Sequence, residues 1–302
     1  MAYNFNIDAL VPKDMASKAE VIGVAKVKLG PLRMLALSIL AGAFIALGAI
    51  FATTVTTGAA GVLPFGVSKL LSGLVFCLGL ILVVGAGAEL FTGNNLIVMA
   101  WASGKVSTAA LMRNWVIVYI GNFLGSILTA LLIVASRQYT FGNGAIGQNA
   151  LNIAQGKLGY DFIQAVALGI LCNALVCLAV WLAIGARSAT DKILAIIFPI
   201  SAFVAAGFEH SVANMYFVPV ALLIKSGAGE SFWTAIGSAP AAYEGLTWGG
   251  FLVNNLLPVT IGNIIGGSVM VGAVYWFIYL RPTWTHTAVE EPEAKPAMAG
   301  ER

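Results

Sequence analysis

Residues 205–214 read Ala-Ala-Gly-Phe-Glu-His-Ser-Val-Ala-Asn, which places an acid, an imidazole and an amide inside an apolar run from residue 193 to 224. That run has 32 residues, whereas a straight helix needs only about 20 to cross a membrane. An unbroken helix would hold Glu209 and His210 near the middle of the bilayer, where a charge costs from about 3 to more than 10 kcal/mol. The stretch therefore predicts a helix that breaks near Gly207, with irregular backbone that lines an enclosed cavity instead of lipid.

The composition indicates the class of protein around this stretch. Of 302 residues, 59% are hydrophobic and only 10% are charged, whereas about 25% are charged in a typical soluble domain. This indicates a polytopic membrane protein surrounded by membrane lipid. The net charge of +3 is small and no basic stripe is present, so a nucleic-acid partner is not expected.

Six membrane spans are expected along the chain, and two of them are too long to be straight. The expected spans are about residues 35–57, 70–102, 115–136, 162–184, 193–224 and 251–280. Like the fifth, the second carries an acid and an amide at its centre, Glu89 and Asn94, so we expect it to be broken too. Residues 1–31 are expected to form an amphipathic segment on the membrane surface, 32–282 the pore domain, and 283–302 a disordered tail.

An internal repeat is legible in the spans. The matches are Glu89 and Asn94 with Glu209 and Asn214, at an offset of 120, and residues 120–125 with 261–266, at an offset of 141. Both matches pair a span with the third one after it, and an odd number of spans per repeat forces opposite orientations. The sequence therefore predicts an all-α membrane protein made of two inverted three-span repeats, about residues 32–136 and 160–282.

The distribution of lysine and arginine predicts the orientation. With six spans, 12 of the 16 basic residues fall on the side that carries both termini. Cytoplasmic loops are enriched in lysine and arginine. Both termini are therefore expected in the cytoplasm.

His210 is the strongest candidate for a functional side chain. It is one of two histidines, and the other, His286, lies in the tail. An imidazole titrates near pH 6.5 in water, so it can give a hydrogen bond or a proton to a passing anion. The second halves of the broken helices begin at mid-membrane, so their positive dipole ends favour an anion there. The competing interpretation is a hydrogen-bonded core histidine with no role in permeation.

Other polar residues in the spans are expected to support the breaks. Glu89 and Glu209 are interpreted as residues that hold the broken segments in place. Thr92 is interpreted as a residue whose hydroxyl faces the permeation path. No HExxH, Walker or CxxC motif is present, and one intramembrane histidine with two separate carboxylates offers too few metal ligands. We therefore expect no enzyme, no metal site and no cofactor.

Several segments resemble one known family. They are residues 56–58, 64–66, 89–92, 207–215 and 258–267, of which Gly-Phe-Glu-His-Ser-Val-Ala-Asn-Met at 207–215 is the most specific. From about residue 25 to 282 the chain resembles the formate/nitrite transporter family. The resemblance implies an aquaporin-like fold, a homopentamer with one pore in each protomer, and a place in the bacterial inner membrane.

The resemblance also implies roles for individual residues. The implied constrictions are Leu80, Leu90 and Phe91 towards the cytoplasm, and Phe76 and Phe203 towards the periplasm. The implied polar path residues are Thr92, at the tip of the second-span break, and His210, steadied by Asn173. The implied braces of the breaks are Glu89, Glu209, Asn214 and Asn263. The implied vestibule cations, which would attract anions, are Lys26 and Lys157.

Two hypotheses of function from different classes remain open. The first is a passive or proton-coupled channel for formate or similar small anions, with nitrite or hydrosulfide as alternative substrates. The second is an aquaporin-type pore for neutral solutes, in which His210 is structural. Flux that responds to pH and to competing anions is expected only from the first.

Overall fold

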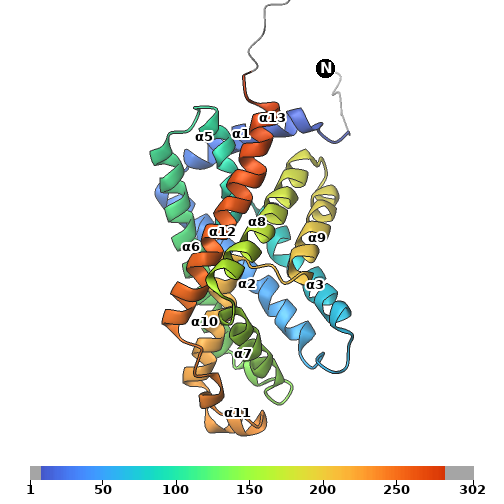
Figure 1. The fold of residues 1–302 in the computed structure, drawn as a ribbon, viewed down its shortest axis with the longest axis vertical. Helices are drawn as coiled ribbons and strands as arrows, with labels where there is room; N and C mark the ends of the chain where they lie inside the picture. Colours follow the sequence, from blue (N-terminus) through green and yellow to red (C-terminus); the bar gives the residue numbers. More distant parts are fainter. Residues whose placement is uncertain (1–7, 283–302) are drawn as a thin grey trace, which may run out of the picture.

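The computed structural model describes residues 8–282, and within that range the chain forms helices and turns with no strand (Figure 1). The prediction of an all-α protein is confirmed. Helix α1 (Pro12–Val27) and the last helix α13 (Val274–Tyr279) lie at one end of the molecule, and α11 (Glu230–Ala235) lies at the other. The predicted disordered tail, 283–302, lies outside the described residues.

Long apolar helices form the body of the bundle. Within residues 8–282, five helices are long and apolar enough to cross a membrane. They are α2 (Pro31–Thr56), α3 (Phe65–Ala86), α6 (Thr108–Ala135), α8 (Phe162–Gly185) and the closing helix Gly250–Tyr279. The closing helix includes α12 (Leu257–Ile264), which two wider π-helical segments flank. The shorter helices α9 (Ala189–Ala205) and α10 (Ser211–Gly227) follow one another and share one crossing between them.

The two predicted helix breaks are confirmed. Helix α3 ends at Ala86 and the chain becomes helical again in α4 (Phe91–Asn94), a 3₁₀ turn at Asn95–Ile97 and α5 (Val98–Ala102). Gly87 (φ 75°) directly follows α3, and Gly207 (φ 76°), at the offset of 120, follows the end of α9 after Ala206. A positive φ is accessible to glycine without a steric penalty, so these glycines turn the chain out of each helix.

Contacts recur in pairs across the molecule, which extends the sequence match. The backbone N–H of Glu89 donates to Leu37 O, and that of Glu209 donates to Leu168 O. The acceptors are 131 residues apart, an offset that the weak similarity of the first and fourth spans did not reveal. The same offset joins α1 to α7 (Ala145–Leu158), which lie towards opposite ends of the molecule (Figure 1). The recurrence therefore includes two helices that precede the ranges assigned to the repeats.

Glycine allows two helix pairs to touch through their backbones. A Cβ added at Gly125 would lie 2.0 Å from Ile39 O, and one added at Gly266 would lie 2.1 Å from Ile170 O. No real Cβ approaches a carbonyl oxygen so closely, because the atoms would overlap. These positions, 141 residues apart, let α6 pack on α2 and the closing helix pack on α8.

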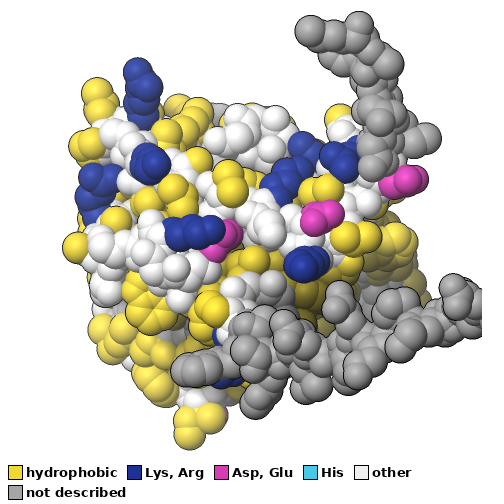
Figure 2. All heavy atoms as spheres, turned by 90° about the horizontal axis from the view of Figure 1, so that it is seen from above, with side chains coloured by type: hydrophobic (Ala, Val, Ile, Leu, Met, Phe, Trp, Pro, Cys, Tyr) yellow, Lys and Arg dark blue, Asp and Glu magenta, His cyan; other side chains and the backbone are white. Residues whose placement is uncertain are grey.

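The end of the molecule that carries α1 is basic. Figure 2 looks onto this end and shows lysine and arginine side chains spread over it, with fewer acidic ones. Helix α1 buries Met15, Ala19 and Gly23, and Arg113 of α6 donates to the backbone oxygen of Val27 at 2.6 Å. Helix α1 is therefore fastened to the bundle.

Candidate functional site

Two cavities of similar size enter the bundle near the two helix breaks. One, of about 510 Å³, lies beside α7 and is called here the α7-side cavity. The other, of about 500 Å³, lies beside α1 and is called the α1-side cavity. Their linings share no residue, so protein separates them.

Helix α3 contributes to both cavities, so the spacing of its residues gives the thickness of the barrier between them. Phe76 lines the α7-side cavity and Leu80 the α1-side cavity, and both are buried. Four helical residues span about 6 Å. A solute that passes from one cavity to the other must therefore cross about one helical turn of apolar side chains.

Four of the five predicted constriction residues line the cavities in the predicted pairs. Phe76 and Phe203 meet edge to face at 5.8 Å in the α7-side cavity, and Leu80 and Leu90 lie in the α1-side cavity. Phe91 differs, because it lines neither cavity. Its ring packs edge to face against Tyr119 of α6, with 4.9 Å between centroids.

His210 occupies the break before α10 and lines the α7-side cavity. Its Nδ1 accepts a hydrogen bond of 3.0 Å from the backbone N–H of Ala213 and so caps α10. An accepting Nδ1 carries no proton, so the proton of the neutral ring is on Nε2. Nε2–H therefore donates to the hydroxyl of Thr92, 2.9 Å away. A second proton can enter the ring only at Nδ1, with loss of the cap.

Thr92 and Asn173 lie behind the imidazole, fully buried. The predicted link from Asn173 to His210 is replaced by another arrangement. Asn173 Nδ2 donates to the backbone oxygen of Thr92 at 3.2 Å and to that of Asn263 at 2.7 Å. Asn173 thus positions the residue that binds His210, because its amide reaches both the first break and the closing helix.

Each break holds a carboxylate that is bound on two sides. Glu89 accepts from Lys26 Nζ and from Asn94 Nδ2, both at 2.7 Å. Glu209 accepts from Lys157 Nζ at 2.8 Å and from Asn214 Nδ2 at 2.7 Å. Asn94 and Asn214 in turn donate to the amides of Asn114 and Asn255. A buried charge is costly unless it is paired and hydrogen-bonded, and both glutamates satisfy that condition.

The backbone of each break is held by one asparagine. Asn263 Oδ1 accepts from Ser211 N at 2.9 Å, and its Nδ2 donates to the carbonyl oxygens of Glu209 and Gly169. Asn122 makes the matching contacts with Phe91 N and with the carbonyl oxygens of Glu89 and Ser38. Asn122 lies in the segment 120–125 that the sequence analysis matched with 261–266, which contains Asn263.

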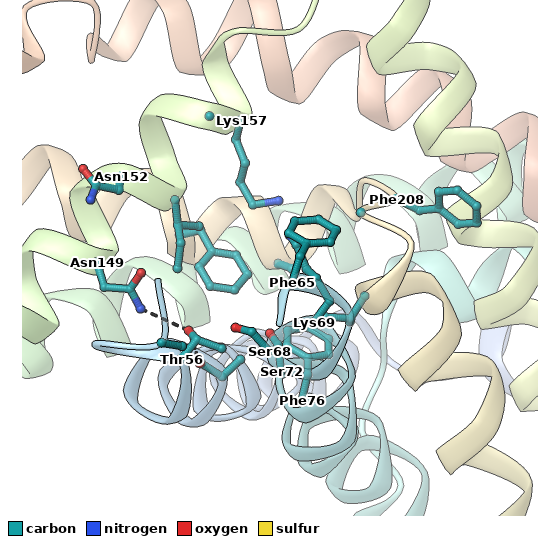
Figure 3. Close-up of a pocket in the computed structure, with 18 of the residues that line it drawn as sticks. Thr56, Phe65, Ser68, Lys69, Ser72, Phe76, Asn149, Asn152, Lys157 and Phe208 are labelled. Atoms are coloured by element: carbon teal, nitrogen blue, oxygen red, sulfur yellow. Dashed lines mark hydrogen bonds between the residues drawn. The ribbon is translucent and has the colours of Figure 1, made fainter. Parts of the chain in front are cut away.

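Lysines line both cavities, and three of them were not singled out by the sequence analysis: Lys18, Lys69 and Lys192. Lys26 and Lys157 are in the predicted cavities, but each is paired with the carboxylate of a break. Lys69 also lines the α7-side cavity and Lys192 the α1-side cavity. Figure 3 shows Lys157 extending its amine into the α7-side cavity, with Lys69 beneath the ring of Phe65.

Nothing in the described part of the chain provides a metal centre. Among residues 8–282, no group of three or more His, Cys, Asp or Glu side chains is placed to hold a metal ion. The site instead consists of two lysine-lined cavities, an apolar barrier and one imidazole. This arrangement can attract an anion, remove its water and offer it a hydrogen-bonding group at the barrier.

Comparison with known proteins points in the same direction. A family model described as Formate/nitrite transporter matches residues 13–277. The chain is 48% identical over 279 residues to the formate channel FocA of Escherichia coli (strain K12), covering 92% of this chain and 98% of that protein. It is 42% identical over 264 residues to the formate channel FocA of Haemophilus influenzae, covering 87% and 93% respectively.

Solved structures resemble this one over most of its length. A pentameric formate channel with formate bound superimposes with a TM-score of 0.79 at 52% sequence identity, covering 83% of this chain and 98% of that one. An ion channel of the FNT family superimposes with a TM-score of 0.72 at 31% identity, covering 88% and 98% respectively.

Proposed function

The chain belongs to the formate/nitrite transporter family, and on that premise we propose that it is a channel that moves formate across a bacterial inner membrane. The observation that carries the proposal is the pair of cavities that stop on either side of one turn of α3, with His210 facing one of them. The formate channels to which the chain is 48% and 42% identical support the choice of substrate. Catalysis is no part of this function.

The apolar barrier selects against bare ions. An ion that leaves water for an apolar passage incurs a desolvation penalty of several kcal/mol even after the protein relaxes. Phe76 and Phe203 on one side and Leu80 and Leu90 on the other offer a carboxylate no hydrogen bond. Formate therefore crosses this turn most readily as formic acid, which carries no charge.

His210 provides the hydrogen-bond donor that an anion meets before the barrier. In the arrangement described, Nε2–H is the group that can turn from Thr92 to an anion in the cavity. The proton that neutralises formate comes from water or from the ring, and the ring carries a second proton only after Nδ1 releases Ala213. Loss of an N-cap costs about 1 kcal/mol. This free energy is small, so thermal fluctuations open the cap often.

The paired lysines act at short range. Lys26 and Lys157 keep side-chain exposures of 25% and 16% in their ion pairs, so their amines can still donate to an anion that has entered. Lys157 also lies 5.2 Å from the ring centroid of Phe217 in the same cavity. Together with His210, Lys157 gives an anion in the α7-side cavity two donors.

Orientation and assembly follow from the charge pattern and from the relatives. The excess of lysine and arginine at the α1 end supports a cytoplasmic position for both termini, so the α1-side cavity opens to the cytoplasm. The similarity to a pentameric formate channel supports a homopentamer with one pore in each protomer. The many large apolar side chains exposed on the spans fit contact with lipid and with neighbouring protomers.

Substrate-resolved flux in proteoliposomes tests the function. Purified protein is reconstituted, and uptake of formate, nitrite, hydrosulfide and glycerol is compared at several pH values. We expect formate uptake that rises as the pH falls and is reduced by competing small anions. Uptake of glycerol with no formate uptake would identify a neutral-solute pore and overturn the proposal.

A further inference from the structure

We propose that Lys69 and Lys192 form the outer anion-gathering sites of the channel, one at each mouth, where they concentrate small monovalent anions before entry. The inference deepens the proposed function and rests on it. It concerns two lysines that line the cavities and form no ion pair within residues 8–282.

Lys69 belongs to the α7-side cavity. It lies at the start of α3, is partly exposed, and holds its amine 5.5 Å from the ring centroid of Phe65. The other charges in the lining are Lys157 and Glu209, which neutralise one another at 2.8 Å. The cavity therefore has a net charge of +1, and that charge is on Lys69.

Neutral polar groups stand around Lys69 and could accompany it in holding an anion. Ser68 and Ser72 come from the same helix, and Asn149 comes from α7 across the cavity. Figure 3 shows Ser68 and Ser72 beside Lys69, and Asn149 on the opposite side of the cavity, where its amide donates to Thr56. The serine hydroxyls can donate to a carboxylate without binding it as tightly as a second cation would, so an anion can be held and released.

Lys192 has the matching place in the α1-side cavity. It lies in the first turn of α9 and is partly exposed. Its neighbour Asp191 is exposed, accepts a hydrogen bond from the backbone N–H of Ser188 and does not line the cavity. Lys26 is paired with Glu89, and Lys18 donates to the backbone oxygen of Ile184 at 2.9 Å. Lys192 is thus the partly buried lysine of this lining that forms no ion pair within residues 8–282.

The repeat places both lysines on the same part of the fold. At the offset of 120 that relates the two breaks, Lys192 corresponds to Ser72, one turn along the helix from Lys69. Each broken crossing therefore carries an unpaired cation on the half-helix that leads to its break. The α1-side lining also contains Lys18, whose amine bonds to a neutral carbonyl, so three lysines and Glu89 give that lining a net charge of +2.

Unpaired lysines act over a longer range outside the cavities than paired ones do. The opposite charges of an ion pair largely cancel beyond a few ångströms, whereas a single charge acts over the screening length, which is about 30 Å at 0.01 M salt and about 3 Å at 1 M. Positive charge in a cleft with apolar walls raises the local concentration of anions and their rate of entry. Lys26 and Lys157 act on anions already inside.

The test is the salt dependence of formate permeability in proteoliposomes. Lys69→Gln and Lys192→Gln are each expected to lower permeability about two- to fivefold at about 0.01 M salt, and to match the wild type at about 1 M. Lys69→Arg retains the charge and should restore permeability. Lys225→Gln and Lys28→Gln remove the same charge outside the cavities and serve as controls. Variants that match these controls at low salt would overturn the inference.

A binding measurement separates this inference from the proposed function. Crystals of the wild-type protein soaked in bromide should show an anomalous peak in contact with Lys69 Nζ, and crystals of Lys69→Gln should lack it. If the wild type carries no formate, the proposed function fails while the bromide peak still supports an anion site. Absence of the peak in the wild type would overturn the site, whatever the flux.

Discussion

Replacing Asn263 by alanine should loosen the break that carries His210. The buried amide makes hydrogen bonds of 2.9 Å with Ser211 N, 2.8 Å with Gly169 O and 3.0 Å with Glu209 O. Hydrogen bonds between membrane helices average about 0.6 kcal/mol each, whereas bonds in soluble proteins contribute about 1 kcal/mol and leave a larger penalty when one buried partner is removed. Three bonds therefore predict a loss of about 2–4 kcal/mol in the free energy of unfolding.

Reversible unfolding in mixed detergent micelles measures this loss, and two matched variants calibrate it. Asn122→Ala removes the equivalent contacts of the other break and should cost a similar amount. Asn152→Ala removes an exposed amide that accepts one bond of 3.1 Å from Tyr243 and should cost less than about 1 kcal/mol. If Asn263→Ala proved as stable as Asn152→Ala, the claim that this amide holds the break would be refuted.

Three further outcomes are expected. His210→Asn keeps an oxygen that can cap α10 and should leave stability within a few tenths of a kcal/mol, whereas His210→Ala should cost about 1 kcal/mol in thermal unfolding; equal effects would argue against the cap. Gly266→Ala brings a Cβ to 2.1 Å from Ile170 O and should cost about 2 kcal/mol or more, whereas Gly227→Ala, with open space around it, should not; similar melting of the two would contradict close packing. Phe203→Ala widens the barrier and should raise acetate flux relative to formate flux in proteoliposomes; an unchanged ratio would show that Phe203 does not restrict the path.

The breaks could be predicted because they depend on local features of the chain. An apolar run too long for one span, with Gly207 and Glu209 near its middle, has few alternatives in a membrane. The second break followed from Glu89 in the same way. Family resemblance then supplied the pairing of Phe76 with Phe203.

The contacts between crossings could not be read from the chain. Lys26 and Lys157 are single residues on helices without a shared motif, so the sequence does not show that each binds the glutamate of a break. The partner of His210 depends on where Thr92 falls after the first break, which tertiary packing decides. The ring of Phe91 packs edge to face against Tyr119 of α6. This contact joins residues that are distant in the sequence, so the sequence alone did not predict it.

The pH dependence of formate flux in wild-type and His210→Asn proteoliposomes tests the central claim most directly. Asparagine can keep α10 capped but carries no titratable proton. The folded pore is therefore expected to remain, while flux falls and its response to pH weakens to that of the formic acid fraction in water. Lys225 lies outside both cavities. The variant Lys225→Gln, measured in parallel, should therefore reproduce the wild-type curve. A His210→Asn curve that overlies the wild type would contradict the account, because permeation would then not depend on the imidazole.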